Sequence, residues 1–195
     1  MRDLPQDFFI VLDSTGLKVT NRGEWIRKKH RKRPRKGWVK LHVALDMNSW
    51  QVINIEVTNE KVHDSQKAIQ LLEGVRVVGE SRGLKVKKLI ADSGYDTHAL
   101  FRYMHANGIE PCVKVRSNAE VSGNTLRDMV VRAYKKGKRA WKRANGYGNR
   151  WFVESYFSVF KRWFGEYVSS VRFENIRSEV VFKVWILNLF LGMMN

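Results

Sequence analysis

Two apolar-rich stretches of this sequence end in the same way, and their endings limit the folds open to the chain. Residues 8–12 and 84–91 are each followed at once by Asp and Ser, with Gly close behind. Such stretches predict strands of a buried sheet. The acids that follow are Asp13 and Asp92, and we expect each at the C-terminal end of its strand, where the loops of an open α/β sheet frame ligand sites.

The segments around these strands predict the rest of the architecture. Residues 39–45 and 52–57 alternate apolar with polar side chains, which predicts a hairpin. A helix capped by Asp64 is expected to end near Gly74. Further along, the pattern predicts a short helix closing at Gly108, a strand over 109–115, a loop-rich basic insert over about 116–148, and helices over 150–164 and 176–193. This order predicts one α/β domain over 1–195, a mixed five-stranded sheet with helices on both faces.

Charge is the unusual feature of the composition. There are 36 Lys and Arg against 19 Asp and Glu, a net charge of +17, so a nucleic acid is the expected partner. Cys112 is the only cysteine, which excludes an internal disulfide and a thiolate zinc site and indicates a reducing compartment such as the cytoplasm. We expect no membrane partner, because the apolar run over 184–194 is shorter than the ~20 residues that span a bilayer; it predicts a buried helix.

The helix predicted over 150–164 offers a third acid. Arg150, Glu154, Ser158 and Lys161 recur at helical spacing on the side opposite the apolar residues. Asp13, Asp92 and Glu154, with no clustered Cys or His, suit Mg²⁺ or Mn²⁺. Two such ions ~4 Å apart can activate water for phosphodiester cleavage. The alternative is that the aspartates only form turns and that the helix stripe is a solvated face.

Three segments carry a resemblance to a known family. The sequences VLDSTG at 11–16, IADSGYDT at 90–97 and YGNRWFVESYFSVFK at 147–161 resemble the catalytic segments of the DDE transposases of bacterial and archaeal insertion sequences. In the last segment, Tyr147, Arg150, Glu154 and Lys161 fit the Y-x2-R-x3-E-x6-K signature of one large branch. The resemblance implies a ribonuclease H-like fold, with two catalytic metal ions held by Asp13, Asp92 and Glu154. It also implies that Tyr147, Arg150 and Lys161 hold the DNA backbone of the transposon end.

The resemblance further implies DNA transposition. Hydrolysis at a DNA end would expose a 3′-hydroxyl that attacks the target, in a homodimer acting on nucleoid DNA in the cytoplasm. Such transposases usually carry a DNA-binding region before the first aspartate, whereas only twelve residues precede Asp13, so we expect no separate N-terminal DNA-binding domain. Two alternatives are a non-catalytic basic DNA-binding remnant of a transposase and a plain metal-dependent nuclease.

Two basic stretches are expected to contact phosphate, and the alternative is that they are solvated linkers. The first holds eight cations in ten residues: Arg27, Lys28, Lys29, Arg31, Lys32, Arg33, Arg35 and Lys36. The second, residues 132–143, places basic residues around Tyr134 and Trp141, which predicts stacking on an unpaired base as well.

Two histidine–aspartate pairs have a simpler expected role. His42 and Asp46 share one strand face near the expected place of Asp13 and could contact the site, but we favour a structural hydrogen bond. His63 and Asp64 are expected to cap a helix rather than bind metal.

Overall fold

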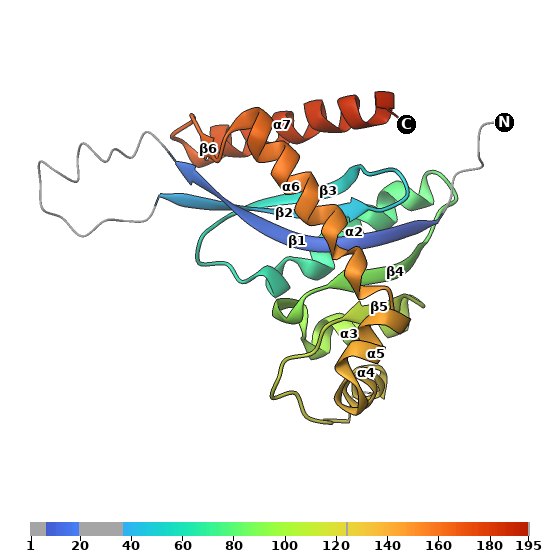
Figure 1. Cartoon of the computed structure of the whole chain (residues 1–195). Coiled ribbons are helices and arrows are strands. Elements are labelled where there is room, and N and C mark those ends of the chain that lie inside the picture. Colours follow the sequence, from blue (N-terminus) through green and yellow to red (C-terminus); the bar gives the residue numbers. More distant parts are fainter. Residues whose placement is uncertain (1–6, 20–36, 124, 195) are drawn as a thin grey trace, which may run out of the picture.

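A computed structural model describes residues 7–19, 37–123 and 125–194 of the chain (Figure 1). The strands form one mixed sheet in the order β3-β2-β1-β4-β5, and β6 pairs with the far end of β1. Their bounds are β1 (Phe8–Val19), β2 (Trp38–Asp46), β3 (Val52–Asn59), β4 (Val86–Ala91), β5 (Glu110–Val113) and β6 (Tyr167–Val168). The predicted hairpin and mixed sheet are confirmed, and β6 was not predicted.

β1 does not stop at Asp13, as the sequence predicted, but continues to Val19. Its second half, including the turn-forming residues Ser14 and Gly16, pairs in antiparallel register with β2, from Asp13↔Val43 to Lys18↔Trp38. The ladder hydrogen bonds to β2 outweigh the local turn preference. Asp13 therefore lies in the middle of a strand.

Helices cover both faces of the sheet, as predicted (Figure 1). Helix α2 (Ala68–Glu80) and α3 (His98–Ala106) lie on one face, and α6 (Trp151–Phe164) crosses the other in front of β1. Short 3₁₀ turns precede α2, α3 and α6, namely η1 (Asp64–Gln66), η2 (Ser93–Tyr95) and η3 (Tyr147–Arg150). The sheet core between these layers includes Ile10, Leu12 and Leu89, which are fully buried.

Helix α2 passes through Gly74, where the sequence predicted its end, and continues to Glu80. The glycine is needed for close packing, since the side chain of Asn54 from β3 fills the space where a β-carbon would stand. Asn54 Nδ2 donates a hydrogen bond to the carbonyl of Leu71 at 3.0 Å. Gly74 thus marks a close approach of helix and sheet rather than a helix end.

The basic insert is helical, whereas the sequence analysis predicted loops. It forms α4 (Thr125–Lys136) and α5 (Lys138–Ala144), separated at Gly137. Tyr134 and Trp141 pack edge to face at 5.2 Å and are buried. The prediction that they stack on an unpaired base is therefore wrong, because their rings form the core between these helices.

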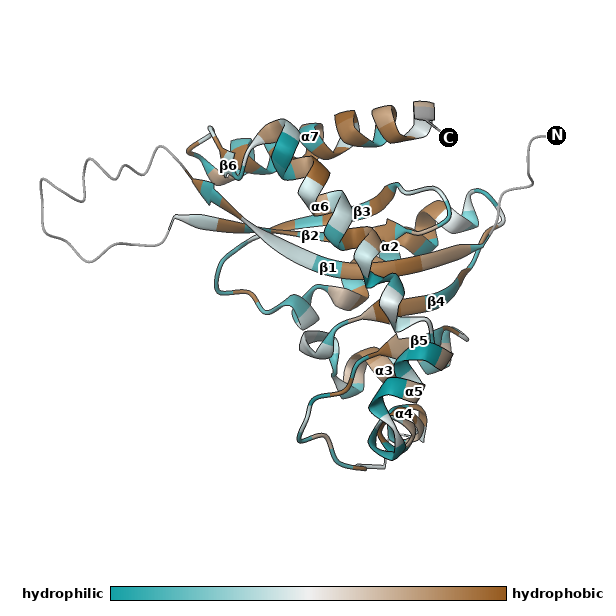
Figure 2. Cartoon of the chain, viewed as in Figure 1, coloured by the Kyte–Doolittle hydropathy of each residue, from teal (hydrophilic) through white to brown (hydrophobic). Residues whose placement is uncertain are grey.

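Helix α7 (Phe173–Met194) is buried on one side only, so the prediction of a buried helix over 184–194 is wrong in part. Val180, Val184 and Leu187 pack inward. The exposed apolar side chains are Val181, Phe182, Trp185, Leu189, Phe190 and Met193, and Figure 2 shows the hydrophobic colouring of this helix. Among the described residues, no helix is long and apolar enough to span a membrane.

Candidate active site

Asp13 and Asp92 come together where β4 ends beside β1. Val11 pairs with Ile90 in parallel register, and two residues further along the chain come Asp13 on β1 and Asp92 just beyond the end of β4. Asp92 directly follows β4, as predicted, and its Oδ1 accepts a hydrogen bond from the backbone N of Gly94 at 2.8 Å. The negative charge of Asp92 reaches Asp13 and contributes to raising its pKa.

Helix α6 carries a cation and an acid to this face. The guanidinium of Arg150, the residue that precedes α6, donates a hydrogen bond from Nη2 to Asp13 Oδ2 at 2.7 Å. The same nitrogen lies 3.8 Å from Glu154 Oε1, one turn along the helix. Asp13 and Glu154 are therefore neighbours across one nitrogen atom, although the Glu154 side chain is 62% exposed and that of Asp13 only 18%.

Burial and mutual contact shift the pKa values of Asp13 and Arg150. Desolvation raises the pKa of Asp13, and the charge and hydrogen bonds of Arg150 and Ser14 oppose that rise. Burial works against the charged form of Arg150 too, but Asp13 and Tyr147 outweigh it and raise the pKa of the guanidinium. Arg150 therefore stays charged and is the main counter-ion of Asp13.

The aromatic ring of Tyr147 lies next to the guanidinium of Arg150. Its ring is buried and lies 6.0 Å from the Arg150 guanidinium and 5.5 Å from the Lys142 amine. Burial raises the pKa of its hydroxyl. The ring of Trp141 also packs against that of Tyr147, with 5.8 Å between the ring centroids, and so joins the basic insert to the site.

Lys161 lies apart from these groups. It follows Glu154 by seven residues on α6, about 10 Å along the helix axis. Its amine is 3.7 Å from Glu166 Oε1. The helix therefore brings Arg150 and Glu154 to Asp13 and leaves Lys161 near its C-terminal end.

The carboxylate oxygens of Asp13, Asp92 and Glu154 are suitable ligands for a hard divalent cation, but the three side chains are not gathered into one coordination site. Among the described residues, no three His, Cys, Asp or Glu side chains are grouped closely enough to hold a metal ion. The three carboxylates supply the oxygen ligands that Mg²⁺ and Mn²⁺ prefer. A cation already lies between two of them, since the Arg150 guanidinium contacts both Asp13 and Glu154.

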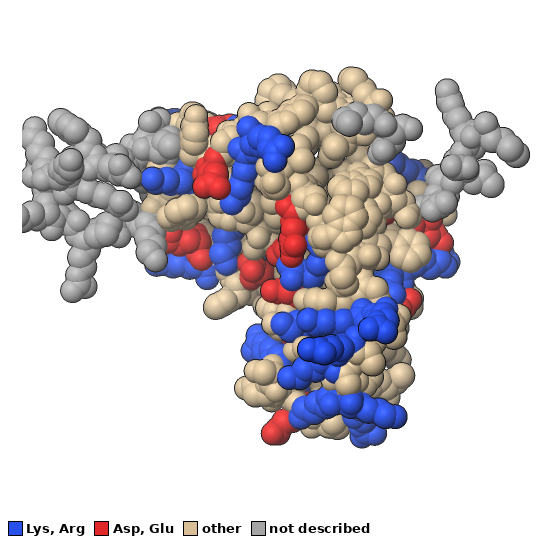
Figure 3. Space-filling model, viewed as in Figure 1, with Lys and Arg blue, Asp and Glu red and all other residues tan. Residues whose placement is uncertain are grey.

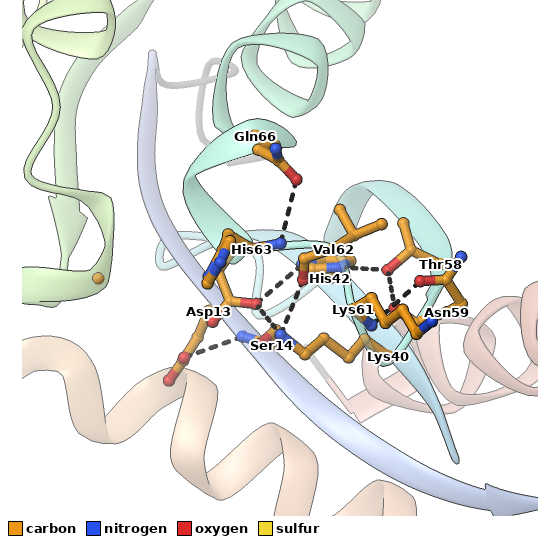
Figure 4. A network of polar contacts seen from close by, with 12 residues as sticks. Asp13, Ser14, Lys40, His42, Thr58, Asn59, Lys61, Val62, His63 and Gln66 are labelled. Carbon is orange, nitrogen blue, oxygen red and sulfur yellow. Dashed lines mark hydrogen bonds and ion pairs between the residues drawn. The ribbon is translucent and has the colours of Figure 1, made fainter. Parts of the chain in front are cut away.

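His42 lies on the other face of the sheet from Asp13. It pairs with Ser14, the neighbour of Asp13, and successive strand residues point to opposite faces. His42 Nε2 is 2.8 Å from Thr58 Oγ1, within a network shared with Lys40 (Figure 4). The favoured prediction of a structural hydrogen bond is confirmed for His42.

Asp46, His63 and Asp64 also have structural partners. Asp46 Oδ1 accepts from the backbone N of Phe9, and its Oδ2 accepts from the backbone N and the hydroxyl of Ser49. His63 precedes η1, and its backbone N donates to Gln66 Oε1 at 3.1 Å. Asp64 begins η1 and pairs with Lys40 at 3.1 Å. The capping prediction is therefore correct for His63, which is the N-cap of η1, and wrong for Asp64, because Asp64 is the first residue of that turn and Lys67 is the N-cap of α2.

The sequence analysis missed two residues of the loop after Asp92. Asp96 is buried and accepts hydrogen bonds from Arg127 of α4, at 2.7 Å to Nε and 3.1 Å to Nη2. This pair ties the insert to the loop that carries Asp92. Tyr95 is buried, and its hydroxyl has no hydrogen-bond partner among the described residues. Desolvation raises its pKa, with smaller contributions from the charges of Asp64, Asp13 and Asp92. The segment IADSGYDT contains both residues, but only the fold shows their surroundings.

Positive side chains gather over α4 and α5 beside the site (Figure 3). The exposed cations of these helices are Arg132, Lys135, Lys136, Lys138, Arg139, Lys142 and Arg143. The other basic stretch, from Arg27 to Lys36, lies outside the described residues. The two helices therefore form the basic face that the structure places next to Tyr147.

Comparisons with known proteins identify the family and the fold of the chain. Residues 5–189 match the family model described as the transposase DDE domain, so the chain belongs to that family. A solved piggyBac transposase, in a synaptic complex with hairpin DNA, is similar with a TM-score of 0.50 and 10% identity over 96% of this chain. The chain spans 47% of that protein's length. The sheet is thus a ribonuclease H-like α/β fold, as the resemblance implied.

A second solved structure matches less closely. It is a simian T-cell lymphotropic virus intasome in complex with PP2A regulatory subunit B56 gamma, with a TM-score of 0.38 and 17% identity. The match covers 71% of this chain and 45% of that one.

Proposed function

We propose that this chain is the catalytic domain of a DNA transposase, which cleaves phosphodiester bonds at transposon ends and transfers the exposed 3′-hydroxyl into target DNA. The observation that carries the proposal is the contact of Arg150 with both Asp13 and Glu154, near the strand end that Asp92 follows, in a chain of the transposase DDE domain family. The chain would act in the cytoplasm on nucleoid DNA, as a homodimer because two ends are joined.

In this proposal, Asp13, Asp92 and Glu154 hold Mg²⁺ or Mn²⁺, in the two-ion arrangement of phosphodiester-cleaving enzymes. The bound ions would supply an activated water and stabilisation of the leaving oxygen. Two of the carboxylates come from the rigid sheet and one from a helix packed on it, so their positions depend on the whole fold. Glu154 is exposed and hence accessible to DNA and metal.

The cations of the site would position DNA. Arg150 can bind phosphate oxygens through two parallel hydrogen bonds, and Lys161 can contact a phosphate further along the strand. Because Tyr147 is buried, its ring would position the Arg150 guanidinium instead of contacting DNA directly. The cations of α4 and α5 and those from Arg27 to Lys36 would bind the duplex through phosphate contacts.

Replacing the acids tests the proposal. The carboxamide variants Asp13→Asn and Glu154→Gln keep size and remove a charged ligand, so Mg²⁺-dependent nicking of a supercoiled plasmid should fall by a factor of about 10² or more. DNA affinity should remain within about twofold of the original chain. Glu80→Gln is the matched control, since Glu80 is an exposed acid of α2 that pairs with Arg76. Equal nicking by the original chain, both site variants and the control would refute the proposed site.

A strand-transfer assay separates a transposase from a plain nuclease, which would share the same site. A short duplex with a recessed, labelled 3′-hydroxyl is incubated with plasmid and Mn²⁺. Labelled plasmid, lost in Asp13→Asn, is the expected product. Nicked plasmid without label would favour the nuclease.

A further inference from the structure

The contact between Arg150 and Asp13 leaves little room for a metal ion on Asp13. Oδ2 accepts from Arg150 Nη2 at 2.7 Å, and Oδ1 accepts from the backbone N of Ser14 at 2.9 Å. A divalent ion binds a carboxylate oxygen at about 2.1 Å, so an ion on Oδ2 would lie beside the positive guanidinium. The two cations therefore compete for one oxygen.

The same guanidinium also lies within ion-pair distance of Glu154. Nη2 lies 3.8 Å from Glu154 Oε1 while it bonds to Asp13. One residue thus serves as counter-ion to two of the three acids. The single positive charge of Arg150 therefore offsets part of the negative charge of these acids, and it would repel a second cation placed at the same oxygen.

Arg150 is not fully satisfied where it lies. Its Nε is buried and has no hydrogen-bond partner among the described residues. A buried, unpaired N–H group costs free energy, so this donor would gain from an additional acceptor. A DNA phosphate offers several strong acceptor oxygens and suits the planar guanidinium better than one carboxylate oxygen does.

We propose that Arg150 is an internal counter-ion that keeps Asp13 and Glu154 from binding metal until a DNA phosphate draws the guanidinium away. The inference rests on the proposed function and adds a coupling to it. A phosphate that takes Arg150 removes positive charge from Asp13 Oδ2, so DNA strengthens metal binding. Because binding couplings are reciprocal, metal strengthens DNA binding by the same factor. The chain would thereby hold metal in its site chiefly when DNA is present.

Manganese binding without DNA tests the inference apart from catalysis. Free Mn²⁺ is measured by electron paramagnetic resonance in titrations of the original chain, Arg150→Gln and Arg162→Gln. Arg162 lies exposed on the same helix, so its variant loses the same charge without freeing Asp13. We expect Arg150→Gln to bind Mn²⁺ about tenfold tighter than the original chain, and Arg162→Gln to stay within about twofold. Equal or weaker binding by Arg150→Gln would overturn the inference.

A second measurement tests the coupling in the original chain itself, so it remains valid if Arg150→Gln does not fold. A short duplex, with its own Mn²⁺ binding determined separately, should raise the affinity of the original chain and of Arg162→Gln for Mn²⁺ by about tenfold. In Arg150→Lys, whose point charge cannot bridge the same groups, that coupling should shrink. The absence of any coupling in the original chain would refute the inference.

The variant Asp13→Asn separates failure of this inference from failure of the proposed function. If Asp13→Asn abolishes Mn²⁺ binding and Arg150→Gln does not alter it, only the counter-ion role is wrong. If Asp13→Asn binds Mn²⁺ as the original chain does when the short duplex is present, then Asp13 holds no metal and both proposals are wrong.

Discussion

Acid should destabilise this protein through His42 before it affects the paired carboxylates. The His42 side chain is fully buried, and its Nδ1 has no hydrogen-bond partner among the described residues. Desolvation lowers the pKa of His42 from 6.5 to about 4. The nearby charges act in both directions, since Asp64 favours protonation whereas Lys40 and Lys67 oppose it.

The sign and size of the effect follow from proton binding. Below pH 6.5 the unfolded chain takes up a proton at His42, whereas the folded chain does so only near pH 4. The stability contribution is therefore complete above pH 6.5 and is lost as the pH falls. Between pH 7 and pH 5 the free energy of unfolding should drop by about 2 kcal/mol from this residue alone.

Urea unfolding at pH 7, 6 and 5, followed by tryptophan fluorescence, measures this loss. His42→Gln removes the titrating group and keeps a polar side chain that can reach Thr58. The variant should be less stable at pH 7, but its stability should change by about 2 kcal/mol less over the range than that of the original chain. His105→Gln, at an exposed position of α3, should keep the full dependence.

The pH range excludes a competing contribution. Hydrogen bonds from Lys183 and from the backbone of Ser169 and Ser170 outweigh desolvation and lower the pKa of Glu179 to about 2, so its share of stability is lost mainly below pH 4.5. Equal pH dependence in the original chain and His42→Gln would refute the reasoning, since it would mean that His42 is protonated equally in the folded and unfolded states.

Three further perturbations test other parts of the structure. Changing Arg132, Lys135, Lys136 and Arg139 to Gln should flatten the salt dependence of DNA affinity by about 0.9 per lost phosphate contact. The same change in net charge at the exposed residues Arg82, Lys87, Arg172 and Arg177 should leave that slope nearly unchanged in the same titration. Arg127→Met leaves Asp96 buried without its partner, and thermal or urea unfolding should show a loss of about 3–5 kcal/mol. Gly74→Ala should lower stability in the same assays despite the higher helix propensity of Ala, because its methyl group would displace Asn54. A more stable Gly74→Ala variant would contradict this prediction, since it would show that the Asn54 side chain can move aside at little cost in free energy.

The sequence by itself determined the features that depend on local pattern. The period-2 alternation of β2 and β3 and the short connection between them predicted their antiparallel pairing, which the structure confirms. The helical spacing of Arg150 and Glu154 placed both on one side of α6, and they do approach within 3.8 Å. The family resemblance, which rested on short motifs around Asp13, Asp92 and Glu154, is confirmed by the family match.

Only the tertiary structure decided features that depend on partners distant in the chain. Ser14 and Gly16 favour a turn locally, but pairing with β2 holds them in a strand. Gly74 lies inside a helix, and its missing β-carbon makes room for Asn54, twenty residues earlier in the chain. The strand register sets Asp13 and His42 on opposite faces, and the crossing of α6 brings Arg150 to Asp13 across 137 residues. Each of these outcomes rests on hydrogen bonds or packing between segments that no local period relates, and such contacts outweigh local preference once the sheet has formed.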